Sequence, residues 1–133
     1  MARRRHLSRI AVMQVLFERE RRPGVDFADA LKRNAEELGE MDMPFAELIL
    51  LGALEQEVKL RAAVQSSAPE WTVDRMDPIS RCVLLVGAFE LLFSRDAPAA
   101  VVINEAIDIA KEYGSAESGK FVNGVLNAIA HQQ

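Results

Sequence analysis

Three residues near the C-terminal end have the spacing of a phosphate-binding loop. Gly114, Gly119 and Lys120 follow the pattern G-x-x-x-x-G-K, in which backbone amides and a lysine cradle nucleotide phosphates. The pattern requires a serine or threonine after the lysine to hold magnesium, but Phe121 occupies that position. It also requires a β-strand before the loop, whereas the preceding segment has helical periodicity. The sequence therefore argues against nucleotide hydrolysis at this position.

The same stretch keeps the features of an anion-binding helix start. We expect Gly114 to end one helix in a left-handed conformation and Ser118 to cap the next one. The amides of Gly119, Lys120 and Phe121 would then point out of a helix N-terminus, which favours an anion.

A second basic feature lies at the other end of the chain. Residues 1–22 contain seven arginines and two acids, a balance of +5, whereas the remaining residues carry a balance of −9. We call residues 1–22 the basic head. A basic segment on an otherwise acidic chain indicates a local contact with a polyanion. A solubilising tail is the alternative.

Length and composition limit the class of protein. The 133 residues suffice for one domain with a hydrophobic core. The single cysteine, Cys82, excludes an internal disulfide framework and a cysteine-rich zinc site. No apolar run is long enough to span a bilayer, and no signal segment follows the arginines. We expect a soluble, cytoplasmic protein without membrane contact or cofactor.

Every long segment has helical periodicity, so the sequence predicts an all-α fold. Helices are expected over about 6–21, 27–38, 43–65, 79–93, 98–110 and 118–130. The helix over 79–93 is apolar on nearly all sides and should be central and buried. For the helix over 43–65, the expected buried stripe is Phe45, Leu48, Leu51, Leu54 and Val58.

The one extended connector is SSAPEWTVDRMDP, residues 66–78. It divides the chain into an N-terminal half, about 1–66, and a C-terminal half, about 77–133. Trp71 lies within the connector and is expected to fold back onto the core.

Several motifs together resemble the NusB family of bacterial transcription antitermination factors. INEAIDIAKEYG (103–114) followed by SGKFVNGVL (118–126) is similar to the C-terminal signature of that family. RHLSRIAVMQVLFE (5–18) is similar to its opening, and FELLF (89–93) to its aromatic-Glu-Leu segment. The resemblance spans essentially the whole chain. It implies a single NusB-like domain over 1–133, with about seven helices in two packed bundles.

The resemblance also implies a function. NusB-like proteins bind boxA elements of single-stranded nascent RNA, above all in ribosomal RNA leaders, together with NusE, a protein of the small ribosomal subunit. The pair acts on the transcription elongation complex and helps RNA polymerase resist termination, without catalysis. The family contains monomers and dimers, so a homodimer is compatible with the resemblance.

Carried over by position, the family motifs indicate two groups of residues. The residues expected to contact RNA are Arg3, Arg4, Arg5, His6, Arg9, Lys120 and Phe121. The residues expected at the NusE-facing surface are Phe17, Ser80 and Leu85. Ser80 replaces an acidic residue of the family and Leu85 replaces an arginine, so NusE binding is the less secure expectation.

Two other functions remain open from the sequence. A NusB-like domain also forms the N-terminal part of some ribosomal RNA cytosine methyltransferases, so the chain could be related to, or a fragment of, such an enzyme. The chain could also be a helical protein-interaction module whose arginines bind nothing specific.

Overall fold

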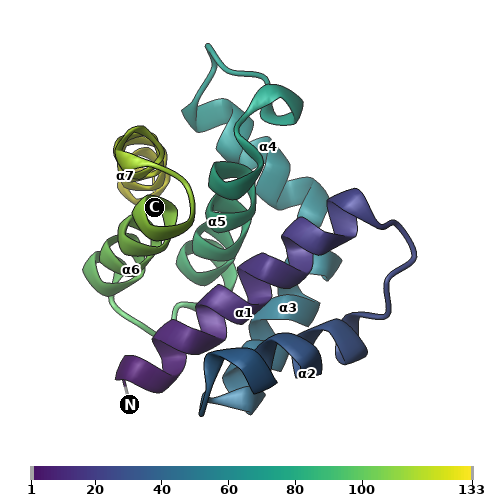
Figure 1. Ribbon diagram of the computed structural model, residues 1–133. Coiled ribbons are helices and arrows are strands. Elements are labelled where there is room, and N and C mark those ends of the chain that lie inside the picture. The colour runs from purple at the N-terminus through teal and green to yellow at the C-terminus, as the bar shows by residue number, and fades with distance from the viewer. Residues whose placement is uncertain (1, 133) are drawn as a thin grey trace.

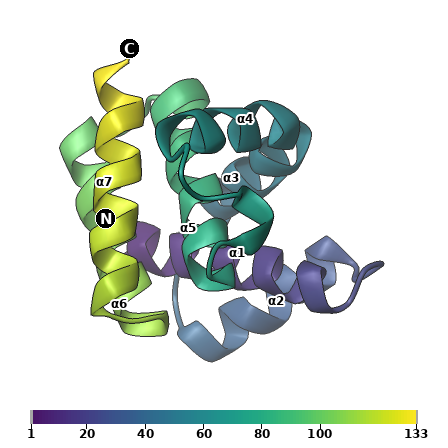
Figure 2. The same ribbon diagram turned by 90° about the horizontal axis from the view of Figure 1, so that it is seen from above.

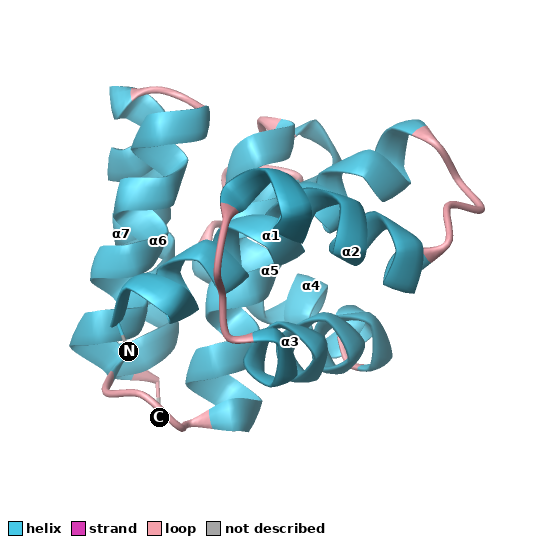
Figure 3. Cartoon of the chain, turned by 60° about the horizontal axis from the view of Figure 1, so that its bottom comes forward, coloured by secondary structure: helices cyan, strands magenta, loops and turns pink. Residues whose placement is uncertain are grey.

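The computed structural model describes residues 2–132, and within that range all regular structure is helical (Figures 1 and 3). The seven α-helices of the described residues are α1 (Ala2–Arg21), α2 (Phe27–Leu38), α3 (Met43–Glu55), α4 (Glu57–Ser67), α5 (Pro78–Phe89), α6 (Ala99–Tyr113) and α7 (Ala116–His131). A short 3₁₀ helix, η1 (Val73–Arg75), precedes α5, and a π-helical turn, η2 (Glu90–Ser94), follows it. The predicted all-α fold is confirmed.

Helix α5 is the central element, as the sequence predicts. All but one of the residues from Ser80 to Phe89 are buried, and α5 packs against α1, α3, α4, α6 and α7. Asp77 starts the helix because its carboxylate accepts hydrogen bonds from the backbone amides of the first turn. Gly87 allows α7 to approach closely, since a β-carbon there would lie 2.8 Å from Leu126 Cδ1.

The remaining helices surround α5 in two groups. Helix α1 crosses α5 and α3 and also packs against α2 (Figure 1). Helices α6 and α7 lie side by side at one edge of the molecule (Figure 2). Buried apolar side chains from both groups form one continuous core, so the connector does not separate two independent cores.

The segment 43–65 differs from the expectation in two ways. It forms two helices, because Gln56 leaves the helical conformation (φ −99°, ψ 13°). The expected buried stripe is wrong at three positions: Leu48, Leu51 and Val58 are exposed. The core face instead consists of Phe45, Ala46, Ile49, Leu50 and Ala53. Helix α3 has apolar residues on two faces, so periodicity alone could not identify which face is buried.

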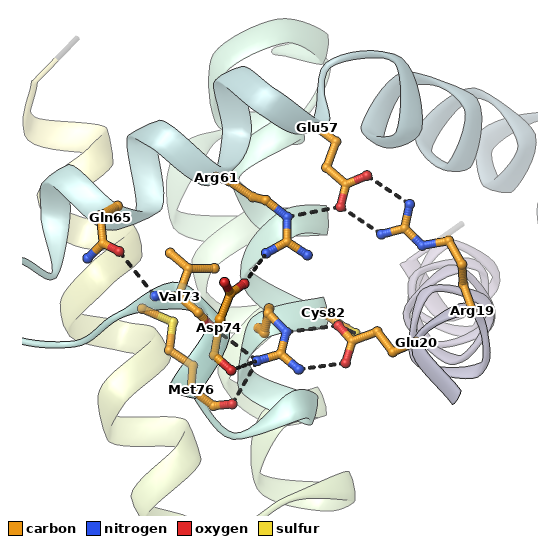
Figure 4. Close-up of polar contacts among 10 residues, drawn as sticks. Arg19, Glu20, Glu57, Arg61, Gln65, Val73, Asp74, Met76 and Cys82 are labelled. Atoms are coloured by element: carbon orange, nitrogen blue, oxygen red, sulfur yellow. Dashed lines mark hydrogen bonds and ion pairs between the residues drawn. The ribbon is translucent and has the colours of Figure 1, made fainter. Parts of the chain in front are cut away.

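A network of arginines and glutamates fastens the connector to the rest of the fold (Figure 4). Arg81 on α5 binds the Glu20 carboxylate with two nitrogens. Its third nitrogen donates to the backbone carbonyls of Val73, Asp74 and Met76 at 3.1, 3.3 and 2.9 Å. Because one guanidinium joins α1, α5 and η1, the end of the connector has a fixed position.

The same network lowers the pKa of Glu57 to about 2. The hydrogen bonds from Arg19, at 2.8 and 2.7 Å, are the main cause, and Arg61 adds another at 3.0 Å. A carboxyl group whose pKa is lower in the folded state stabilises the fold above its ordinary pKa of 4.5. That stabilisation disappears as the pH falls toward 2.

We therefore expect a pH-dependent effect from the Glu57→Gln substitution. It should destabilise the protein by on the order of 2 kcal/mol above pH 5, and the deficit relative to wild type should shrink between pH 4.5 and pH 2. Urea unfolding at several pH values measures this difference. Glu55→Gln, at an exposed neighbouring carboxylate, is the control. A deficit that stays constant with pH would contradict the assignment.

Candidate nucleic-acid interface

The turn between α6 and α7 requires glycine, but not for the expected reason. Gly114 ends α6 as predicted, yet its φ is −113°, outside the left-handed region. A β-carbon at this position would lie 2.7 Å from Ser118 Oγ and 2.8 Å from the Ala110 carbonyl oxygen. The start of α7 packs against the end of α6 so closely that there is no space for a side chain at residue 114.

Helix α7 begins earlier than the sequence predicts. Ser115 is its N-cap, and the Ser115 side chain accepts a hydrogen bond from the Ser118 amide at 3.1 Å. The prediction of Ser118 as the cap is thus wrong; its hydroxyl donates to Asp77 at 2.8 Å and joins α7 to the start of α5. The Gly119 amide already bonds to the Ser115 carbonyl at 3.1 Å. Lys120 and Phe121 therefore offer side chains, not free amides, to a ligand.

These two side chains near the start of α7 differ in exposure. The Lys120 side chain is exposed, and its amino group lies 3.8 Å from the exposed Glu117 carboxylate. The Phe121 ring is partly buried and packs against the core. Its ring also meets Trp71 edge to face, with centroids 6.0 Å apart and an interplanar angle of 73°.

The position of Trp71 differs from the expectation that its ring folds back onto the core. It does not fold back onto the core, and 56% of its surface is exposed. Its backbone is nevertheless held firmly, because Gln65 Nε2 donates to the carbonyls of Ala68 and Trp71 at 3.2 and 2.6 Å. Gln65 Oε1 also accepts from the Val73 amide at 3.1 Å (Figure 4). The loop thus presents an exposed aromatic ring from a fixed position.

An open groove of about 780 Å³ runs beside this aromatic pair. Trp71 and Phe121 line one part, and Tyr113 at the end of α6 lines another. Arg75 and Lys120 contribute positive charge to its lining. The volume lies within the roughly 300–1,000 Å³ of small-molecule sites, so the groove can accommodate a nucleotide-sized group.

The arginines of the basic head differ in their availability. Arg3 and Arg4 are exposed, although Arg4 lies 2.9 Å from the exposed Glu40 carboxylate. Arg5 donates to Asp96 at 2.6 Å and its guanidinium lies 4.2 Å from the centroid of the Phe45 ring. At Arg4 a phosphate would replace an ion pair between two exposed side chains, whereas at Arg5 it would have to displace a less exposed one.

Arg9 and His6 lie in a charged cluster between helices. The side chain of Arg9 is only 4% exposed, and it binds both Glu90 oxygens at 2.7 and 2.8 Å. Arg9 also donates to Glu105 at 3.1 Å, and His6 Nδ1 lies 3.1 Å from the same oxygen. Burial opposes the charge of Arg9, but these carboxylates outweigh it and raise its pKa. Arg9 joins α1 to η2 and α6, and its guanidinium does not reach the surface.

Tyr113 connects the basic head with the groove electrostatically. Burial and the charge of Glu112 raise the pKa of the Tyr113 phenol, and the positive charge of Arg3 partly offsets the rise. Since Tyr113 lines the groove, the charge of the basic head influences one group of the groove lining.

The residues expected at the partner-facing surface do not lie together on a surface. Phe17 is partly exposed, and the Arg21 guanidinium lies 5.2 Å from its ring centroid. Ser80 is buried and its hydroxyl donates to Asp77 at 2.8 Å. Leu85 is buried in the core. The placement of Ser80 and Leu85 at a surface is therefore corrected: an uncharged Ser80 is satisfied by Asp77, and an apolar Leu85 gains from burial.

The site residues missed from the sequence are aromatic. Trp71 stands in a connector with no periodicity, so nothing indicated whether its ring would face the core or solvent. Tyr113 stands at the last position of a helix, immediately before the glycine turn. The proximity of Trp71 to the start of α7 results from tertiary packing of α4 against α7.

The fold and the site define an all-helical protein whose exposed aromatic rings and cations suit a nucleic acid. Among the described residues, no group of histidine, cysteine and acidic side chains could hold a metal ion. No helix over residues 2–132 is long and apolar enough to cross a membrane.

Comparison with known proteins identifies the family. The NusB family model matches residues 6–131, so the chain belongs to the NusB family. A transcription antitermination protein NusB from Desulfitobacterium hafniense is 38% identical over 128 residues, which cover 94% of this chain and 86% of the relative.

Solved structures agree with this assignment. NusB from T. maritima is 35% identical, with a TM-score of 0.85 over 97% of this chain and 92% of that one. A second structure is described as antitermination factors NusB and NusE in complex with double-stranded RNA. Its matching chain is 26% identical, with a TM-score of 0.86 and full coverage of both chains. The predicted NusB-like fold is confirmed.

Proposed function

We propose that this protein is an RNA-binding transcription antitermination factor that recognises boxA-type RNA together with NusE. The RNA would belong to nascent transcripts, especially ribosomal RNA leaders. The observation that carries the proposal is the surface formed by Lys120, Phe121 and Trp71 beside an open groove, in a chain of the NusB family. The protein would act in the cytoplasm on the transcription elongation complex, without catalysis or cofactor.

The chemistry of this surface fits RNA. Arginines and lysines bind phosphates, and aromatic rings stack on unpaired bases, each base contributing about 1–3 kcal/mol. Arg3, Arg4 and Lys120 are exposed cations suited to the phosphates. Phe121 is the aromatic side chain next to Lys120 in sequence. Arg5 and His6 would contribute only after their partners, Asp96 and Glu105, release them.

For Arg9 we propose an indirect role. Its guanidinium is buried, so it would hold α1 against α6 and thereby fix the direction in which the basic head projects. A direct phosphate contact would add to the salt dependence of RNA binding, whereas this indirect role would not.

NusE binding is a separate proposal. Phe17 and the adjacent face of α1 would border the contact, while Ser80 and Leu85 could act only by shaping α5 from inside. A homodimer remains a further proposal, to be tested by the oligomeric state in solution.

The two alternatives from the sequence have less support. The curated relative from Desulfitobacterium hafniense is an antitermination protein and is covered over 86% of its own length, which favours this reading over a methyltransferase domain. An interaction module without RNA binding does not account for the exposed aromatic and cationic groups beside the groove.

Titration with RNA, with and without NusE, tests the proposed function. The protein is mixed with a boxA-type single-stranded RNA, a scrambled RNA of equal composition and a duplex of the same sequence. Preferential binding of the boxA strand, strengthened by NusE, is expected. Equal and weak binding to all three RNAs would contradict the proposal.

Replacing Phe121 with leucine should separate stacking from packing. Leucine preserves the apolar volume against the core, so the melting temperature should change little. RNA affinity should fall by roughly 5- to 10-fold, because leucine cannot stack on a base as an aromatic ring does. Fluorescence anisotropy of labelled RNA measures the affinity, and Phe121→Tyr serves as the control that retains the ring. Unchanged affinity in the leucine variant would mean that Phe121 serves only the core.

A further inference from the structure

The aromatic pair of Trp71 and Phe121 lies between two grooves. The larger, of about 780 Å³, extends toward the end of α6 and the start of α5. The smaller, of about 370 Å³, lies toward the end of α4 and is lined by Pro69, Gly124 and the same two aromatic residues. Both grooves are also lined by Lys120. Glu70 also lines the smaller groove. The pair therefore forms a ridge with open space on both sides and Lys120 beside both grooves.

Side chains from two helices hold the loop that carries Trp71 by hydrogen bonds to its backbone. Gln65 spans the loop and bonds to the backbone of residues 68, 71 and 73. Arg81 then fixes the following turn through its three carbonyl contacts. An indole on a fixed backbone loses little conformational entropy when it binds a ligand. An exposed tryptophan on such a fixed backbone indicates that the loop binds a ligand and does not only connect α4 to α5.

The larger groove is lined by two cations and two carboxylates, and the partners of the carboxylates decide which charges are open to a ligand. The Asp77 carboxylate lies in the lining, but it is occupied by the Ser80 and Ser118 hydroxyls. Glu117 is exposed, and its carboxylate lies 3.8 Å from the Lys120 amino group on the same helix, in a pair that solvent screens. The cations at the groove, Arg75 and Lys120, are both exposed and can bind phosphate.

We propose that Trp71 and Phe121 together form a stacking site for an unpaired RNA base, with the sugar-phosphate chain passing over the ridge from one groove to the other. This inference rests on the proposed RNA-binding function and adds Trp71 as a contact residue. Single-stranded RNA fits better than duplex RNA, because paired bases cannot offer a free face to a ring.

The fluorescence of Trp71 can report RNA binding at this site, because Trp71 is the only tryptophan in the chain. Titration of the full chain with a 12-nucleotide boxA-type RNA should quench its fluorescence as the base stacks. A series of the same RNA with one abasic ribose at a time should identify one or two positions at which both quenching and affinity are lost. An unchanged emission on saturation with bound RNA would overturn the proposal.

Substitutions of Trp71 test the stacking site separately from RNA binding in general. Trp71→Ala should weaken binding of the same RNA about 10-fold, and Trp71→Phe should restore most of the affinity. Phe93→Ala is the control, since Phe93 is an exposed aromatic residue that stacks on Phe89 instead. If wild type binds RNA but Trp71→Ala binds equally well, the stacking site is excluded and the RNA-binding function stands. If wild type binds no RNA, both fail.

Discussion

Replacing Arg9 with alanine is expected to destabilise the protein by about 3–5 kcal/mol. The substitution leaves the Glu90 carboxylate buried, with only 2% of its side chain exposed and without the two hydrogen bonds it now accepts. Removing one partner of a buried ion pair costs more than the pair contributes, because the remaining charge stays out of water. Urea unfolding followed by circular dichroism measures the change.

Two further variants show whether this cost comes from the unpaired charge. Arg9→Met combined with Glu90→Leu removes both charges and keeps apolar volume, so most of the lost stability should return. Arg5→Ala removes an arginine one turn earlier in α1 whose ion pair with Asp96 is largely solvent-exposed, and it should cost under about 1 kcal/mol. If Arg9→Ala cost no more than Arg5→Ala, the pair with Glu90 would not be a buried structural contact.

The Arg9/Glu90 double variant also tests how Arg9 serves RNA binding. A direct phosphate contact contributes about 0.7 to the slope of log affinity against log salt for single strands. We expect no such loss in the double variant, because the guanidinium is buried between helices. A slope reduced by about 0.7 would show that Arg9 leaves its carboxylates and binds phosphate.

Arg9 illustrates what the sequence could and could not predict. Helical periodicity indicated the helix over 6–21 and placed arginines along it, since spacing along the chain fixes which residues share a face. It did not indicate that Glu90 and Glu105 would meet Arg9, because those residues lie more than 80 positions away. A family motif rich in arginine therefore includes structural residues as well as residues that contact the ligand.

Helices α5 and α3 show the same limit of sequence-based prediction, here for apolar residues: tertiary contacts determine which face of a helix is buried. Helix α5 was predicted correctly because it is apolar on nearly all sides and must be buried whatever its orientation. Helix α3 has apolar residues on two faces, and only contact with α1 and α5 determines which one is buried. Leu48 and Leu51 consequently face solvent, against the expectation.

The candidate site was predictable where it depends on local sequence. Lys120 and Phe121 stand next to each other in a motif, and their helix was recognised from its periodicity. The cap was misassigned because Ser115 and Ser118 are both suitable N-cap residues, and the contact of Ser118 with Asp77 decides between them. Trp71 was missed as a site residue because its position depends on the packing of the connector.

The largest functional effect should come from removing the exposed cations Arg3, Arg4 and Lys120 together. Each phosphate contact on single-stranded RNA contributes about 0.7 to the salt slope, so replacing all three with alanine should reduce a slope of roughly −3 to −4 by about 2 units. Affinity at low salt should fall by at least about 100-fold. At high salt the variant and wild type should converge, because the lost contacts are those that salt already weakens.

A charge-matched control distinguishes this local effect from a change in net charge. Lys32, Arg33 and Lys59 are also exposed, and they lie outside the groove and the basic head. Replacing these three with alanine changes the net charge equally but should leave the slope within about 0.5 of wild type. Equal flattening in both variants would mean that RNA responds to total charge. Flattening confined to Arg3, Arg4 and Lys120 would place the phosphates between the start of α1 and the start of α7, where Tyr113 and Phe121 lie beside their path.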